Sequence, residues 1–299
     1  MKRLLARLLG TSEKQVQQDS QEAGEGAFGK DVPTRPWMRP GVGRAAAVGW
    51  LLDTPRAHFI WGAPRRISRD DAAPVHAKSV SHCPAVNDHD ARMWDIPCPI
   101  DVRLGFRRDA DGKPGLVNLE GDKASIRGKH LTQLVTMVAE KEWRHPDRPI
   151  IQIHTPYIFL SDEPIWMAQM PPISSYRREQ WPGLVIGGRL PIHIWPRPMM
   201  WAFEWWDTDS SLSLTRGEPW FHIRFETLDP QRHVRLIEAE LTTDLREYMN
   251  GISSVANYVD KTFSLFKVAQ ERRPTHLLVG KDRSSKADRS RSEPPSTPT

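Results

Sequence analysis

Apolar and aromatic residues are concentrated in residues 184–226, where parts of the sequence alternate between apolar and polar positions. Residues 190–194 and 220–226 alternate with period two, the side-chain repeat of a β-strand. Residues 199–206 are apolar on both faces except for Glu204, as in a strand that is covered on both sides. We therefore predict three or four meandering strands here, in an antiparallel or mixed sheet.

The same period predicts strands elsewhere in the chain. Residues 100–106 and 116–119 are expected to form a hairpin, because the Asp-Gly pair at residues 111–112 favours a tight turn. Residues 150–160 and 165–170 are expected to be a second pair of strands across a short turn.

Apolar residues are spaced by three and four in two places, which predicts helices. One helix is expected at residues 129–143, where it would cover the sheet. A second helical pattern begins at about residue 242, after a last strand at 233–239, and Pro274 ends it. The predicted fold class is mainly β (α+β), with one β-sandwich domain and a helical C-terminal segment.

Composition divides the chain into three parts. Residues 1–45 are expected to be flexible, because a segment rich in Gln, Glu, Gly, Ser and Pro cannot bury enough apolar surface to offset the entropy of ordering. Residues 46–272 are expected to form a single β-rich domain. Residues 273–299, which end in Ser, Pro, Arg and Lys, are expected to be a disordered tail.

Charge and cysteine content narrow the class of protein. The 299 residues carry a net charge of +5, which is spread along the chain and permits an acidic partner without indicating nucleic acid. Two cysteines give no disulfide framework. No run approaches the ~20 apolar residues of a membrane span. We therefore expect a cytoplasmic protein without a transmembrane segment.

Residues 82–101 are dense in potential metal ligands. These are His82, Cys83, His89 and Cys98. Structural zinc sites place their ligands in close pairs that are separated by a longer loop, and this spacing does not match them. A loop that leads into a strand explains the segment, and we predict no metal site there.

Three histidines fall on predicted strands, namely His154, His193 and His222. Together with Glu204 or Glu226 they could supply the two histidines and one carboxylate of a non-haem iron oxygenase. The close His-x-Asp or His-x-His pair that is usual in such sites is missing. We therefore predict no metal and no cofactor, and keep the oxygenase as an alternative.

Two tryptophans stand beside polar residues in the alternating pattern, Trp195 and Trp220. The polar residues that share their faces are His193, His222, Arg224 and Glu226. A large aromatic side chain beside charged groups suits a contact that is apolar at one end and exposed to water at the other. We predict that these six residues line a ligand groove or a subunit interface.

Short motifs resemble an uncharacterised family of bacterial and phage proteins, a domain of unknown function. They are Cys83-Pro-Ala85, Trp94-Asp-Ile-Pro97 followed by Pro99-Ile-Asp101, Pro182-Gly183 and Arg216-Gly-Glu-Pro219. The resemblance covers about residues 75–230. It implies a bacterial or phage origin and no particular activity.

The order of elements from residue 182 to residue 225 is similar to the end of the dUTPase and dCTP-deaminase fold, a β-clip that assembles as trimers. Those enzymes carry an Asp where this chain has Gly187, Gly188 and Arg189, and their Ser-containing phosphate motif has no counterpart here. The resemblance implies a β-clip-like fold and an oligomer, and it does not extend to the catalytic residues.

The leading functional prediction is a non-catalytic, oligomeric binding or structural module. Its partners would be further copies of the chain and a small-molecule or protein ligand. Two enzymatic alternatives remain open, a nucleotide-metabolising hydrolase of the β-clip type and the non-haem iron oxygenase.

Overall fold

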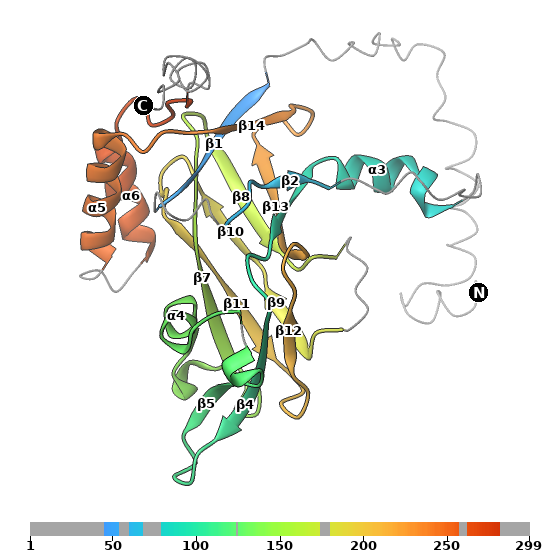
Figure 1. Ribbon diagram of the computed structural model, residues 1–299. Coiled ribbons are helices and arrows are strands. Elements are labelled where there is room, and N and C mark those ends of the chain that lie inside the picture. The colour runs from blue at the N-terminus through green and yellow to red at the C-terminus, as the bar shows by residue number, and fades with distance from the viewer. Residues whose placement is uncertain are drawn as a thin grey trace, which may run out of the picture. The chain divides into compact units, whose positions relative to one another are not determined.

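Strands dominate the part of the chain that the structure, a computed structural model, describes (Figure 1). The described residues are 45–53, 60–67, 79–123, 125–173, 180–256 and 262–281. All of them belong to one compact unit, which begins at Arg44. The mainly β prediction is confirmed, whereas the predicted flexible segment 1–45 lies outside the described residues except for Ala45.

The largest sheet has six strands in the order β14-β1-β7-β11-β9, and β6 pairs with β7 as well. The bounds are β14 (Val234–Glu238), β1 (Ala46–Leu52), β7 (Ile150–Leu160), β11 (Pro198–Trp205), β9 (Gly183–Ile186) and β6 (Val135–Met137). β14 is parallel to β1, and the other pairs are antiparallel, so the sheet is mixed.

A second sheet has the order β10-β8-β13-β3-β2, and a third has the order β12-β4-β5. The bounds are β10 (Gly188–Pro191), β8 (Ile165–Met170), β13 (Pro219–Thr227), β3 (Met93–Pro97), β2 (Arg65–Arg66), β12 (Leu212–Leu214), β4 (Val102–Arg108) and β5 (Pro114–Asn118). The predicted hairpin is confirmed as β4 and β5. Its tip holds Gly112 with φ of +79°, a value that favours glycine.

Two predicted strand arrangements are wrong. Residues 150–160 and 165–170 form β7 and β8, but these strands pair in different sheets rather than with each other. Residues 184–226 do not meander, because β9 and β11 lie in the first sheet, β10 and β13 in the second, and β12 in the third. Neighbouring strands of this stretch therefore cross between sheets.

The helix expected at residues 129–143 is also wrong in most of its length. Only α4 (Gly128–Leu134) is helical there, and Val135 starts β6, which pairs with β7. A 3₁₀ turn, η4 (Glu140–Glu142), follows. The remaining short elements are η2 (Val80–His82), α3 (Pro84–Asp90) and η3 (Gly121–Lys123). β-Branched residues at 135–136 fit a strand, and pairing with β7 satisfies their backbone groups.

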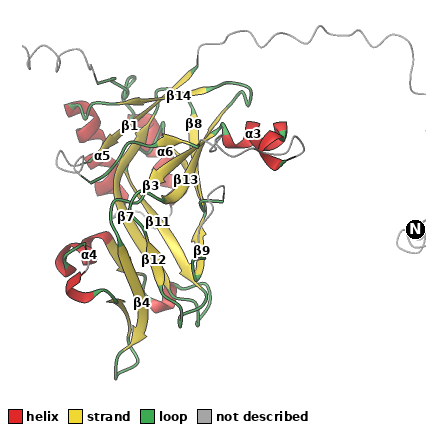
Figure 2. Ribbon diagram, turned by 45° about the vertical axis from the view of Figure 1, so that its right-hand side comes forward, coloured by secondary structure: helices red, strands yellow, loops and turns green. Residues whose placement is uncertain are grey.

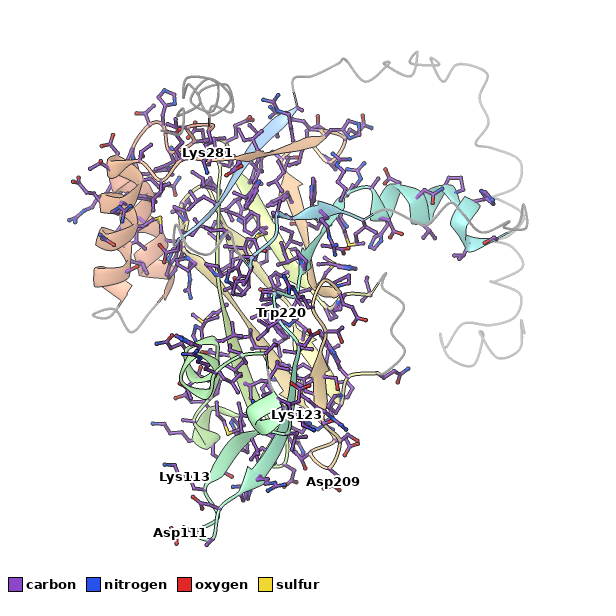
Figure 3. The ribbon with its side chains drawn as sticks, viewed as in Figure 1. Asp111, Lys113, Lys123, Asp209, Trp220 and Lys281 are labelled. Carbon is purple, nitrogen blue, oxygen red and sulfur yellow. The ribbon has the colours of Figure 1, made fainter. Side chains whose placement is uncertain are left out.

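One hydrophobic core collects the inward side chains of all three sheets. Its largest fully buried members are aromatic: Trp201, Trp205, Trp220, Tyr157, Phe159, Phe203 and Phe221. The rings of Trp201 and Trp220 meet edge to face with their centroids 5.6 Å apart. Figure 3 shows Trp220 in the middle of the stranded region.

A smaller core lies between the outer face of the six-stranded sheet and two helices, α5 (Thr243–Ala256) and α6 (Thr262–Arg272). Figure 2 shows both helices together on one side of β1. Tyr248 of α5 donates a hydrogen bond to the carbonyl of Ile194 at 2.7 Å or to that of Ala269 at 2.9 Å. Burial raises the pKa of this phenol to about 12, so it stays neutral and available as a donor.

Residues 273–281, which we expected in the disordered tail, pack against the domain instead. Arg273 donates hydrogen bonds to three backbone carbonyls, those of His193, Ser161 and Asp162. The Asp162 side chain accepts from the backbone of Leu277 at 2.6 Å. The boundary at residue 273 is therefore wrong, and residues 282–299 lie outside the described residues.

Among the described residues, no helix combines the length and the apolar content that crossing a bilayer requires.

Candidate functional site

Trp220 does not lie on a solvent-facing side of its strand. It is 0 % exposed and packs against Trp61 and Trp201. β13 is a central strand between β8 and β3, and its register with β3 shifts between Pro219 and Phe221. The irregularity places both Trp220 and Phe221 in the main core, so the exposure that we expected of Trp220 is wrong.

Trp195 also lies in a core rather than in a groove. Residues 192–194 form a turn, not a strand, and Trp195 is 8 % exposed. Its ring meets that of Phe266 on α6 at a centroid distance of 4.7 Å. The expected position of Trp195 on an exposed strand face is therefore wrong, because the chain turns and α6 covers it.

Three of the four polar residues of the predicted face contact other groups of the protein, and the Trp166 ring lies against both His193 and Arg189, the ion-pair partner of Glu226. His193 is buried, with its Nδ1 2.9 Å from the Ile165 carbonyl, and burial lowers its pKa. His222 Nε2 lies 2.9 Å from an Asp95 carboxylate oxygen. Arg224 is half-buried. Glu226 forms an ion pair with Arg189 at 2.7 Å, next to Trp166. Trp220 lies in the main core and Trp195 in the smaller one, so the six residues do not form one binding surface.

The residues considered for iron are likewise scattered. His154 Nε2 is 3.0 Å from the hydroxyl of Thr136. Glu204 is buried and accepts hydrogen bonds from Arg144 at 2.7 Å and from the Trp206 indole at 2.9 Å. The hydrogen bond from Arg144 lowers the pKa of Glu204. In the described ranges, no group of three or more His, Cys, Asp or Glu side chains could hold a metal ion.

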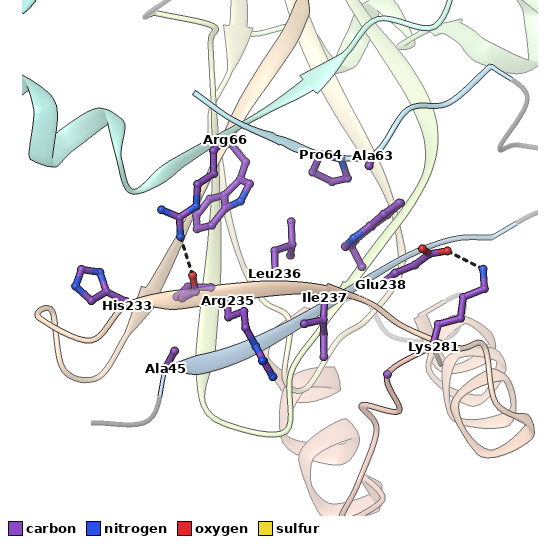
Figure 4. Close-up of a pocket in the computed structure, with 14 residues that line it drawn as sticks. Ala45, Ala63, Pro64, Arg66, His233, Arg235, Leu236, Ile237, Glu238 and Lys281 are labelled. Carbon is purple, nitrogen blue, oxygen red and sulfur yellow. Dashed lines mark hydrogen bonds and ion pairs between the residues drawn. The ribbon is translucent and has the colours of Figure 1, made fainter. Parts of the chain in front are cut away.

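A cleft of about 930 Å³ opens elsewhere, between β14 and the segment at residues 61–67 (Figure 4). This volume is at the upper end of the range of ligand sites, about 300–1,000 Å³. The residues that line it come from five separate parts of the chain: 45–50, 63–66, Trp94, 233–238 and 280–281. β14 is an edge strand of the first sheet, and β2 is an edge strand of the second. The cleft therefore lies between two sheet edges.

The floor of the cleft is apolar. Trp50 and Trp94 line it and are almost fully buried. The guanidinium of Arg66 lies over the Trp94 ring at 5.2 Å and donates to the carbonyl of Val234 at 3.3 Å. Leu236 points from β14 toward Arg66 and Pro64 in Figure 4. Arg66 thus ties β2 to β14 across one end of the opening.

Positive charge prevails around the cleft. Its cationic residues are Arg66, Arg235 and Lys281, and its one carboxylate is that of Glu238. Lys281 and Glu238 form an ion pair at 2.6 Å. The Arg235 side chain is exposed, points away from the floor in Figure 4, and forms no hydrogen bond or ion pair with any residue that the structure describes. The unpaired charge of the site is therefore positive.

The sequence analysis missed these residues. The alternation at 233–239 indicated a strand, but no signal indicated that it would pair with β1, which lies more than half of the chain length away. Arg66, Arg235 and Lys281 each look like ordinary surface cations in the sequence. A charged residue alternating with apolar ones on a short edge strand was the one available clue.

Comparison with the models of known protein families and with curated proteins finds no match to this chain.

Proposed function

We propose that this protein is a non-catalytic binding module and that its ligand, which is acidic and partly apolar, occupies the cleft beside β14. The observation that carries the proposal is the cleft itself, which combines an apolar Trp floor with an excess of positive charge. Aromatic floors supply large contact areas, and unpaired cations at the rim favour anionic ligands.

The arginines, the lysine and the carboxylate that line the cleft are arranged for binding rather than for acid–base chemistry. Glu238 is neutralised by Lys281, and Arg66 is held by Trp94 and by a backbone carbonyl. Arg235 is the remaining cation, and an arginine keeps its charge at any physiological pH. Such groups orient and attract a ligand without exchanging protons with it.

The finer parts of the predicted architecture also belong to this proposal. We propose that the six-stranded and five-stranded sheets are the two layers of one sandwich or β-clip-like domain, which is supported by the single core that their inward side chains share. Self-association, a cytoplasmic location and a bacterial or phage origin stay predictions.

The test uses a probe that is both apolar and anionic, 1-anilinonaphthalene-8-sulfonate, whose fluorescence rises in apolar sites. Arg235→Glu changes the charge at the rim by two units without removing a described contact. In water, a unit charge on the probe and a unit charge about 6 Å away at the rim interact by about 0.7 kcal/mol. The variant changes the rim charge by two units, so the affinity for the probe should fall roughly tenfold at low salt.

The matched control is Arg107→Glu, an equally exposed arginine on β4, away from the cleft. It should leave the affinity of the probe unchanged. Equal affinities for the two variants and the unaltered protein would show that the probe does not bind at the cleft, and the proposed function would then fail.

A further inference from the structure

One edge of β14 faces the cleft with backbone groups that the sheet does not use. Ala46 N donates to His233 O at 2.9 Å, and Ala239 N donates to Trp50 O at 2.8 Å. In a parallel pair with this register, the odd-numbered residues of β14 bond to β1. The residues whose amide and carbonyl groups point away from β1 are Val234, Leu236 and Glu238.

The carbonyls at the two ends of this edge already have donors. Arg66 donates to Val234 O, and the backbone of Lys281 donates to Glu238 O at 2.9 Å. Lys281 belongs to a short segment that adds to β14 beside an antiparallel bridge between Ala239 and Gly280. The edge therefore accepts an added segment from the chain itself, and the described part of this segment, which ends at Lys281, reaches one end of the cleft.

Leu236 lies between the two ends. Its amide and carbonyl point to the cleft side of β14, and no described residue bonds to either group. An open amide and carbonyl on an edge strand form a template for another extended segment. From Val234 to Glu238 the edge spans about 13 Å at roughly 3.3 Å per residue, the length of a short peptide.

We propose that the cleft binds a short extended peptide with alternating apolar and acidic residues, which adds as a strand to the edge of β14 at Leu236. This inference rests on the proposed function and names its ligand class. Side chains alternate between the faces of an added strand. The apolar ones would meet Leu236, Trp50 and Trp94, and the acidic ones would meet the exposed Arg235 on the other face.

Charge and composition favour a separate peptide over the chain's own C-terminal residues. Residues 282–299 follow Lys281, which lines the cleft, but their sequence contains no large apolar side chain for its floor. They also lack the alternation of acidic and apolar residues, and they carry several arginines that the cations of the cleft would repel.

The test measures fluorescence anisotropy of a labelled peptide, Thr-Glu-Val-Glu-Val-Glu-Thr with blocked ends, on the full chain. Two matched peptides distinguish the contribution of charge to binding from that of strand addition. One carries Lys in place of Glu, and the other carries N-methyl groups on the Val amides, which removes ladder donors without changing charge. We expect each to bind at least about tenfold more weakly than the parent peptide, because each loses hydrogen bonds or charge pairs.

A direct readout follows the Leu236 amide. In protein labelled with ¹⁵N-leucine, this resonance is assigned by its absence in Leu236→Ile. The parent peptide should shift it and slow its hydrogen exchange. Leu236→Pro removes the amide that faces the edge and no ladder bond to β1, so it should abolish binding of the parent peptide. If that variant is unfolded, the N-methylated peptide makes the same comparison on unaltered protein.

Each failure points to a different conclusion. Equal binding of the parent and N-methylated peptides would overturn strand addition, while the Arg235→Glu result could still support an acidic ligand in the cleft. If the naphthalene probe depends on Arg235 and the parent peptide does not bind, the inference fails alone. A synthetic copy of residues 282–295 that binds more tightly than the parent peptide would overturn the proposal in favour of the chain's own tail.

Discussion

Replacing Trp220 with alanine tests whether the core has been assigned correctly. The side chain is fully buried and contacts Trp61 and Trp201 at centroid distances of 5.6 Å in both cases. Removing a buried Trp side chain costs about 3–5 kcal/mol, through lost burial and the cavity that remains. The Trp220 indole N–H has no hydrogen-bond partner among the described residues, so its removal also relieves a desolvated donor. We therefore expect the lower part of that range, about 3–4 kcal/mol.

The assay is equilibrium unfolding in urea followed by far-ultraviolet circular dichroism. With an m-value of about 3 kcal/mol/M, the midpoint should fall by about 1 M. Trp220→Phe keeps a ring and removes the unpaired N–H, so it should lose less than half as much. Trp206→Ala is the matched control, because Trp206 is 52 % exposed, and it should cost about 1 kcal/mol through one lost hydrogen bond. Equal losses for the Trp220 and Trp206 alanine variants would refute the buried position of Trp220.

Three further predictions each concern one residue. Arg273→Ala should destabilise the domain by roughly 2–4 kcal/mol in urea unfolding, because it leaves several backbone carbonyls without a donor. Gly183→Ala should cost about 1–3 kcal/mol, since a Cβ there would overlap the carbonyl of Glu204, whereas Gly188→Ala, with open space around it, should cost much less. Burial lowers the pKa of His193 in the folded state, so the unfolded state binds a proton more readily. Stability should therefore fall as pH drops below about 6.5. Thermal melts at pH 5–8 should show a smaller dependence of stability on pH for His193→Gln.

Local signals in the sequence were sufficient for single strands and for one hairpin. β4 and β5 were predicted because alternation and an Asp-Gly turn lie within a few residues of each other, and a tight turn fixes which strands pair. The strands at 150–160, 165–170 and 233–239 were also found, with bounds close to those of β7, β8 and β14.

Partners of the strands were not predictable in the same way. Whether β8 pairs with β7 or with β13 depends on contacts between distant segments, and period two is the same in either case. The alternation at 220–226 failed for a related reason, because the irregular register at Trp220 and the neighbours on both sides of β13 bury residues of either parity. A pattern of polar and apolar residues cannot distinguish a central strand with buried polar pairs from an exposed one.

A second explanation of the cleft is that its cations only protect the edge of a sheet. Edge strands commonly carry Lys or Arg to prevent pairing with other sheets. If the cations served only to protect the edge, we would expect a charged residue or a distortion at its middle. The middle residue of β14 is instead Leu236, which has an apolar side chain and an amide and carbonyl to which no described residue bonds. The donors from Arg66 and Lys281 instead lie at the two ends. The strand edge of another sheet would be too long, because it would collide with Arg66 and Lys281 at the two ends. A peptide of a few residues would fit between them. Under our proposal, the same residues both protect the sheet edge and select the length of a bound strand.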